Sequence, residues 1–85
     1  MSENQIVMYG TTWCPDCARA KRVFDKLGTG YKWVDIEKDG KARDYVVRVN
    51  HGYRSVPTIV FPDGSILVEP GDAELAKKLG AAKSD

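Results

Sequence analysis

Hydrophobic residues in the first half of the chain switch between strand-like and helix-like spacing. The run QIVMY, Gln5–Tyr9, is short, apolar and rich in β-forming residues, and it ends at Gly10, which indicates a buried strand. Apolar residues then recur every three or four positions, which predicts one helical face. They are Cys17, Ala20, Phe24 and Leu27, and the glycines Gly28 and Gly30 close the helix. The alternating segment Tyr31–Ile36 predicts the next strand.

The second half of the chain predicts a helix, a hairpin and a last helix. Helical spacing of Ala42, Tyr45, Val46 and Val49 ends at the turn residues Asn50–Gly52. Two β-forming runs, Val56–Phe61 and Ser65–Glu69, flank Pro62–Gly64, a hairpin signal. Asp72 is expected to cap a helix that carries Leu75, Ala76 and Leu79. The order βαβαββα predicts an α/β fold with a four-stranded mixed sheet flanked by three helices.

Length, charge and apolar content narrow the possible functions. The 85 residues predict a single domain over 1–85, with a polar tail from about 80 to 85. Thirteen Lys and Arg against twelve Asp and Glu argue against a nucleic-acid partner. No apolar run reaches the roughly 20 residues that span a bilayer. The start MSENQIVMYG lacks the pattern of a secretory signal, so we expect a cytoplasmic protein, where structural disulfides are rare.

Both cysteines lie in TTWCPDCARAK, where the first strand gives way to the first helix. Proline is favoured at the first helical position, so a helix starting at Pro15 makes Cys14 its N-cap. The free N–H groups of Asp16 and Cys17 would then point towards the Cys14 sulfur, and the positive helix end would favour a thiolate there. Cys17 starts the apolar stripe and is expected to be more buried. Cys14 is therefore predicted to attack a disulfide and Cys17 to resolve the mixed disulfide that results.

Two neighbours of Cys14 each allow two interpretations. The carboxylate of Asp16 either disfavours a thiolate beside it, in which case Asp16→Asn speeds alkylation of Cys14, or is only a solvated first-turn acid. Trp13 is predicted to form one wall of a substrate groove, with a core position as the alternative.

The cysteines could also form a structural disulfide or hold a metal. A disulfide across two intervening residues closes too short a loop to remove much unfolded-state entropy. A closed zinc site takes four ligands, and this chain offers two cysteines and one distant histidine, His51. We therefore expect no metal site within one chain, while a cluster shared between two chains stays open.

The segment SVPT, Ser55–Thr58, is the second group of interest. Pro57 at a strand start can simply mark a sheet edge. The other interpretation is a cis Val56–Pro57 bond, which the C-x-x-C motif favours. Such a bond would leave the Val56 backbone N–H and C=O free to pair with a substrate beside Cys14.

These segments together resemble the glutaredoxin-like members of the thioredoxin superfamily. The resemblance rests on WCPDC, on RSVPTIVFPDGS and on GD before the last helix, and it runs from Ile6 to about Leu79. The likeness is closest to the mycoredoxins, through TT-W-C-x-x-C, V-D-I-E and V-N-x-G-x-R-x-V-P-T. It implies a minimal thioredoxin fold that reduces mixed disulfides between proteins and a small thiol. It also implies a cis Pro57 facing Cys14 and Cys17, with Val56 as the backbone partner of the bound thiol.

The resemblance also suggests which residues hold the small thiol. Asp72 matches an acid that helps to hold the amino group of glutathione, with a plain helix cap as the alternative. Arg54 could contact an anionic group, or it could be a solvated surface residue. Glutaredoxins often carry a lysine before the first cysteine, where this chain has Thr11 and Thr12. Mycothiol and bacillithiol therefore stand beside glutathione as candidate co-substrates, and no bound cofactor is expected.

The sequence thus predicts a thiol–disulfide oxidoreductase with a Cys-Pro-Asp-Cys dithiol. We expect a monomer that acts on disulfide-containing proteins and small-thiol mixed disulfides, without a nucleic-acid or membrane partner. One alternative is a thioredoxin-like electron donor recharged directly by a flavoprotein reductase, for example for ribonucleotide reductase. The other is a non-catalytic iron–sulfur module formed by two chains.

Overall fold

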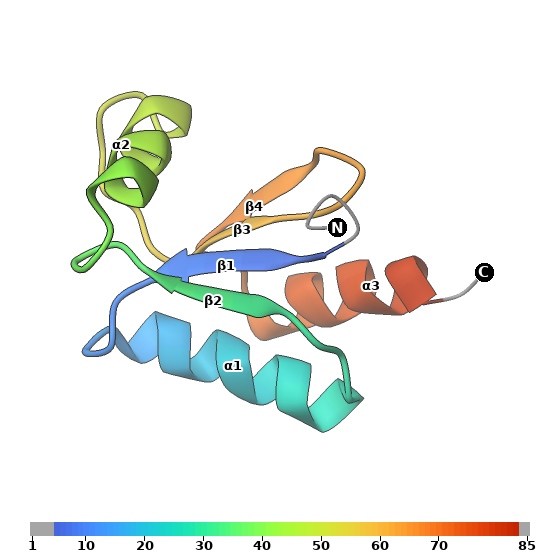
Figure 1. Cartoon of the computed structure of the whole chain (residues 1–85). Coiled ribbons are helices and arrows are strands. Elements are labelled where there is room, and N and C mark those ends of the chain that lie inside the picture. The colour runs from blue at the N-terminus through green and yellow to red at the C-terminus, as the bar shows by residue number, and fades with distance from the viewer. Residues whose placement is uncertain (1–4, 84–85) are drawn as a thin grey trace.

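The computed structural model describes residues 5–83, and its elements follow the predicted order (Figure 1). The strands are β1 (Val7–Gly10), β2 (Lys32–Asp35), β3 (Thr58–Val60) and β4 (Ile66–Val68). The helices are α1 (Pro15–Leu27), α2 (Gly40–Val49) and α3 (Asp72–Lys83). This is the predicted βαβαββα arrangement.

The strands form one mixed sheet in the order β2-β1-β3-β4. β1 pairs parallel with β2 and antiparallel with β3, and β3 pairs antiparallel with β4. Figure 1 shows α1 and α3 side by side on one face of the sheet and α2 on the other. The predicted thioredoxin-like α/β fold is confirmed. Because β1 and β2 are parallel, the loops that follow them meet at one edge of the sheet, and the loop after β1 carries both cysteines.

Each face of the sheet has its own apolar cluster. The larger cluster lies under α1 and α3 and includes Met8, Phe24, Ile59, Leu75 and Leu79. The smaller cluster lies under α2 and consists of Ile36, Ala42 and Val46. Burial on both faces explains why β1, one of the two inner strands, is made almost wholly of apolar residues.

The structure corrects three details of the sequence prediction. The strand expected at Val56–Phe61 is shorter, because pairing with β1 runs only from Thr58 to Val60 and Pro57 has no N–H to donate. Asp72 is the first residue of α3 and not its cap, since its carboxylate instead pairs with Arg19. α3 continues to Lys83, into the segment expected to be a polar tail; residues 84–85 lie outside the described residues.

Candidate active site

Cys14 occupies the N-cap of α1, and Pro15 opens the helix as predicted. Its backbone is extended, with φ −81° and ψ 119°. The Cys14 side chain makes no capping hydrogen bond with the first-turn N–H groups. The thiol instead donates to the Val56 carbonyl oxygen, at 3.9 Å. Cys14 is therefore held against the loop that precedes β3.

Cys17 lies one turn further along α1 and points into the core. It is 1% exposed, against 8% for Cys14, so the predicted difference in burial is confirmed. Burial raises the pKa of the Cys17 thiol to about 12, with Cys14 adding to the rise and the Thr11 backbone and Lys21 opposing it. Cys17 therefore stays protonated at neutral pH, whereas Cys14 keeps a small opening to solvent.

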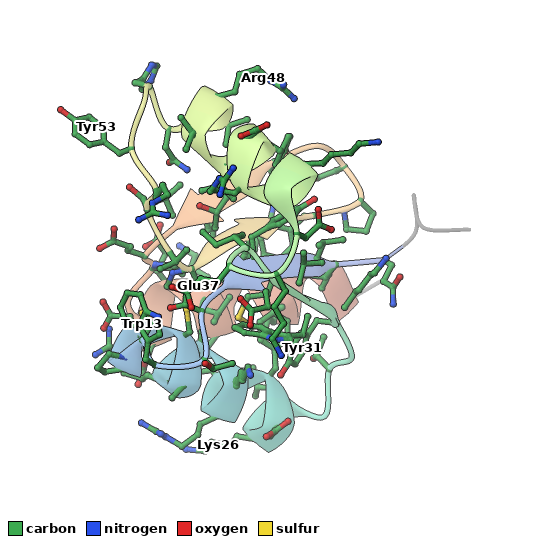
Figure 2. The ribbon with its side chains drawn as sticks, turned by 60° about the vertical axis from the view of Figure 1, so that its left-hand side comes forward. Trp13, Lys26, Tyr31, Glu37, Arg48 and Tyr53 are labelled. Atoms are coloured by element: carbon green, nitrogen blue, oxygen red, sulfur yellow. The ribbon has the colours of Figure 1, made fainter. Side chains whose placement is uncertain are left out.

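A small pocket of about 70 Å³ lies beside Cys14, lined by Thr11, Trp13, Ile36, Glu37, Arg54 and Val56. Three residues singled out from the sequence, Trp13, Arg54 and Val56, therefore meet at one place. Trp13 is 66% exposed, which rules out the core position that was its alternative. Its indole Nε1 donates to Glu37 Oε1 at 3.0 Å, and Figure 2 shows the two labelled side chains close together. The pocket has an aromatic wall and carries one acidic and one basic group.

The floor of the site is formed by the segment before β3. The Val56–Pro57 bond is cis, as predicted, and Pro57 is buried. The buried Thr58 hydroxyl donates to the Ser55 carbonyl at 2.7 Å and accepts from Asn50 Nδ2 at 3.1 Å. Asn50 also donates to the Val46 carbonyl at 2.8 Å, which ties the segment to the end of α2. This network fixes the carbonyl that faces Cys14.

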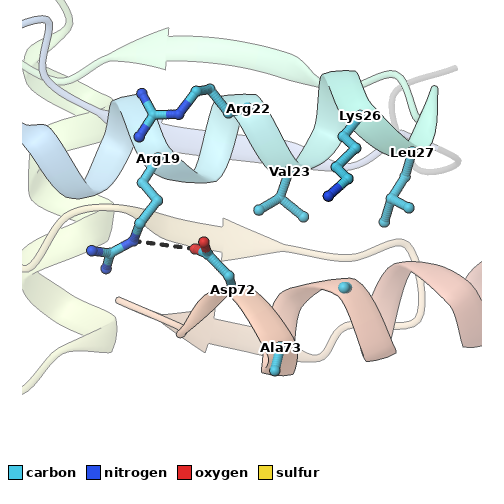
Figure 3. A pocket seen from close by; sticks show the side chains of 8 residues that line it. Arg19, Arg22, Val23, Lys26, Leu27, Asp72 and Ala73 are labelled. Carbon is cyan, nitrogen blue, oxygen red and sulfur yellow. Dashed lines mark ion pairs between the residues drawn. The ribbon is translucent and has the colours of Figure 1, made fainter.

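Asp72 lies on a groove between α1 and α3 and is not among the residues that line the pocket beside Cys14. Its Oδ1 is 3.2 Å from Arg19 Nε, as the dashed line in Figure 3 marks. The Arg19 guanidinium also reaches Asp16 Oδ1 at 2.9 Å. The Asp16 side chain is 41% exposed and forms an ion pair with Arg19, so its charge is partly compensated, and both interpretations of its effect on Cys14 stay predictions.

Sequence reasoning missed several residues of this site. Glu37 could have been found, because it follows the parallel strand next to β1 and such strand ends meet at one sheet edge. The Asn50–Thr58 hydrogen bond joins two segments whose approach no local pattern predicts. The buried Thr11 hydroxyl has no hydrogen-bond partner among the described residues, and it lines the pocket.

Two negative observations apply to residues 5–83. Within that range there is no group of three or more His, Cys, Asp and Glu side chains placed to hold a metal ion. Across the same part of the chain, none of the helices is both long and apolar enough to cross a membrane.

The fold and the site define a class: a thioredoxin-fold protein with a C-x-x-C dithiol at the start of its first helix. The sequence profile of the glutaredoxin family matches residues 6–66. The chain belongs to the glutaredoxin family, and it is a thiol–disulfide oxidoreductase whose active-site pair is Cys14 and Cys17.

Known relatives agree with this assignment. Mycoredoxin 1 of Corynebacterium glutamicum is 35% identical over 78 residues, which cover 92% of this chain and 96% of the relative. A Mycobacterium tuberculosis protein whose name places it among the glutaredoxins is 40% identical over 74 residues, covering 87% of this chain and 88% of its own. Among solved structures, Methanosarcina acetivorans methanoredoxin superposes with a TM-score of 0.71 at 25% identity, covering 98% of this chain and 87% of that one.

Proposed function

We propose that this enzyme reduces mixed disulfides between proteins and a low-molecular-weight thiol, with Cys14 as nucleophile and Cys17 as resolving cysteine. The observation that carries the proposal is the unequal burial of the two thiols. Cys14 keeps 8% of its surface and contacts Val56, which lines the pocket, whereas Cys17 is enclosed behind it. A thiol that is enclosed and protonated is a poor nucleophile for the first step, but it is close enough to attack the neighbouring cysteine within the same molecule.

The proposed chemistry runs in two steps. The Cys14 thiolate attacks the small-thiol sulfur of the mixed disulfide, the old S–S bond breaks, and the protein thiolate leaves. Cys17 then loses its proton and attacks the Cys14 sulfur, which forms the Cys14–Cys17 disulfide and releases the small thiol. The two cysteines are oxidised by two electrons and the substrate disulfide is reduced by two. A low-molecular-weight thiol, or a reductase, then returns the dithiol.

The pocket residues suggest how the small thiol is held. Trp13 supplies an apolar wall, and the Val56 carbonyl and the cis Pro57 face the sulfur that Cys14 attacks. Arg54 can meet a carboxylate, and Glu37 can meet a hydroxyl or an amino group. An amino group at Asp72 would have to compete with Arg19, which already occupies that carboxylate at 3.2 Å. A small thiol that depends on an amino-group contact at Asp72 is therefore the least suited of the candidates.

The test is turnover of one protein mixed disulfide with glutathione, mycothiol and bacillithiol compared in parallel. We expect at least one of the three thiols to support turnover. Arg54→Gln and Glu37→Gln should shift the enzyme's preference between a charged and an uncharged thiol in opposite directions. Failure of all three would overturn the proposal.

We further propose that the enzyme works as a monomer in a reducing compartment, the cytoplasm. The balanced charge and the site built from one chain support this. Light scattering of the reduced protein tests the oligomeric state, and a stable dimer would contradict it. A colour after anaerobic purification would point instead to the iron–sulfur module.

A second function is favoured by one observation. A solved thioredoxin-like protein superposes with a TM-score of 0.68 at 28% identity, covering 91% of this chain. The chain could accordingly be an electron donor recharged by a flavoprotein reductase. Assays coupled to NADPH and thioredoxin reductase, or to a thiol and its own reductase, separate the two functions.

A further inference from the structure

Lys21 lies over the indole ring of Trp33, on the core side of α1. Its Nζ is 3.5 Å from the ring centroid, a close cation–π contact. Lys21 is one turn beyond Cys17 on the same helix, so the two side chains leave the same face. Trp33 packs against the larger apolar cluster, which fixes the ring on which the ammonium rests.

Gly10 brings that ring next to the Cys17 sulfur. A Cβ placed on Gly10 would lie 2.5 Å from Cys17 Sγ and 2.8 Å from Trp33 Cη2. The sulfur and the far edge of the indole therefore both pack against the same backbone point at the end of β1. Because Gly10 has no side chain, the ring that anchors Lys21 also borders the resolving thiol.

The resolving step requires a negative charge on a sulfur that water barely reaches. Burial is the main cause that raises the pKa of Cys17 to about 12, Cys14 raises it further, and Lys21 lowers it. The Thr11 backbone also lowers it through a hydrogen bond, and Gly10 with the apolar indole of Trp33 lies beside the sulfur. Once Cys14 is bound in a mixed disulfide it carries no charge, and Lys21 is then the cation that acts on the thiolate.

We propose that Lys21, held over Trp33, is a positioning residue for the resolving step, where its ammonium stabilises the Cys17 thiolate as it attacks Cys14. This inference rests on the proposed roles of the two cysteines. In the step, Cys17 gives up its proton, its sulfur bonds to the Cys14 sulfur, and the S–S bond to the small thiol breaks. The departing thiolate takes up a proton, so no net proton is consumed. Lys21 acts through its charge and transfers no proton.

Stopped-flow absorbance with an aromatic disulfide that releases a coloured thiolate separates the two steps in one trace. The first release reports attack by Cys14, and the second reports displacement by Cys17. We expect Lys21→Met to lower the ratio of the second rate to the first by about three- to tenfold, because a single charge acts over a short, partly shielded distance. The rise of the second rate with pH should move to higher pH. Lys21→Arg should restore both the ratio and the profile.

Two further variants distinguish a role in charge from a role in packing. Lys26→Met removes a cation from the exposed last turn of α1 and should leave the ratio within twofold. Trp33→Leu removes the platform and should lower the ratio while Lys21 is still present. An unchanged ratio and pH profile in Lys21→Met would overturn this inference alone. Loss of the first release in the wild-type protein would overturn the proposed function instead.

Discussion

The surroundings of Cys14 and Cys17 differ far more than their separation of three residues suggests. Cys14 keeps 8% of its surface exposed and donates to the backbone carbonyl of Val56 at 3.9 Å, and Val56 lines a pocket with polar and charged walls. Cys17 faces Gly10 and the indole of Trp33, inside the fold. Both side chains belong to the first turn at the start of α1, yet Cys14 keeps a small exposed surface whereas Cys17 is enclosed in the core.

This contrast shows how a helix start can give two identical thiols different chemistry. The N-cap residue lies outside the regular helix, at the sheet edge where loops gather. One turn later the chain has entered the apolar stripe that packs against β1. Burial, with a further contribution from Cys14, raises the pKa of the second thiol and keeps it protonated at neutral pH.

Replacing either cysteine should have the largest effects on activity, and it tests directly whether the two thiols have different roles. Cys14→Ser should lower reduction of a mixed disulfide by about a thousandfold or more, because a serine hydroxyl does not ionise near neutral pH. Cys17→Ser should still react once, and should turn over where free thiol can release the mixed disulfide. Steady-state rates with and without added thiol check this. Equal loss in both variants would contradict the division of roles.

Adding a side chain at Gly10, beside Cys17, should disturb the packing around Cys17 and not the surroundings of Cys14. The Cβ of Gly10→Ala would meet Cys17 Sγ at 2.5 Å and the Trp33 ring at 2.8 Å. We expect the free energy of unfolding to fall by about 1–3 kcal/mol, as for an overpacked core. Gly30→Ala is the matched control, since nothing lies within 4 Å of its added Cβ. It should change stability by less than about 0.5 kcal/mol. Urea unfolding of the reduced proteins gives both values, and a neutral Gly10→Ala would refute the packing described here.

Alkaline pH should reveal the enclosed thiol. The folded-state pKa of Cys17 is raised by burial to about 12, well above the ordinary value of 9.0 for a free thiol. Its contribution to stability is therefore complete below about pH 9 and is lost as the pH rises towards 12, with a slope of at most about 1.4 kcal/mol per pH unit for one proton. Tyr9 and Tyr31, whose pKa values burial also raises, act in the same direction. The free energy of unfolding is measured against pH for the reduced wild type and for Cys17→Ser, and the difference isolates the contribution of the Cys17 thiol. Parallel curves for the two proteins would contradict a raised pKa for Cys17.

The smallest expected effects lie at the rim of the pocket. Trp13→Phe keeps an aromatic wall but loses the indole N–H that reaches Glu37. Because this hydrogen bond is exposed, stability should change by no more than about 0.5 kcal/mol. KM for a mixed disulfide should rise a few-fold, and Glu37→Gln, which keeps an acceptor for the indole, should show a weaker rise. A change in kcat without a change in KM would place Trp13 in the chemistry and not in binding.

Sequence patterns predicted the positions of the two cysteines in the helix and the order of the elements well, because these depend on local features. Helical spacing placed Cys17 on the buried stripe, and Pro15 placed Cys14 at the N-cap. What local features could not supply was contact between distant segments. Trp33 and Cys17 lie against the same glycine, Gly10, only because β2 pairs with β1. Arg19 pairs with the Asp72 carboxylate only because α1 and α3 pack together.

Limited alkylation tests the central claim most directly. The fully reduced protein is treated near pH 7.5 with less than one equivalent of iodoacetamide, and the labelled peptide is identified by mass spectrometry. Unequal burial of the two thiols predicts that the label is found on Cys14 while Cys17 stays unmodified until the fold is denatured. Labelling of Cys17 first, or of both at equal rates, would contradict the account.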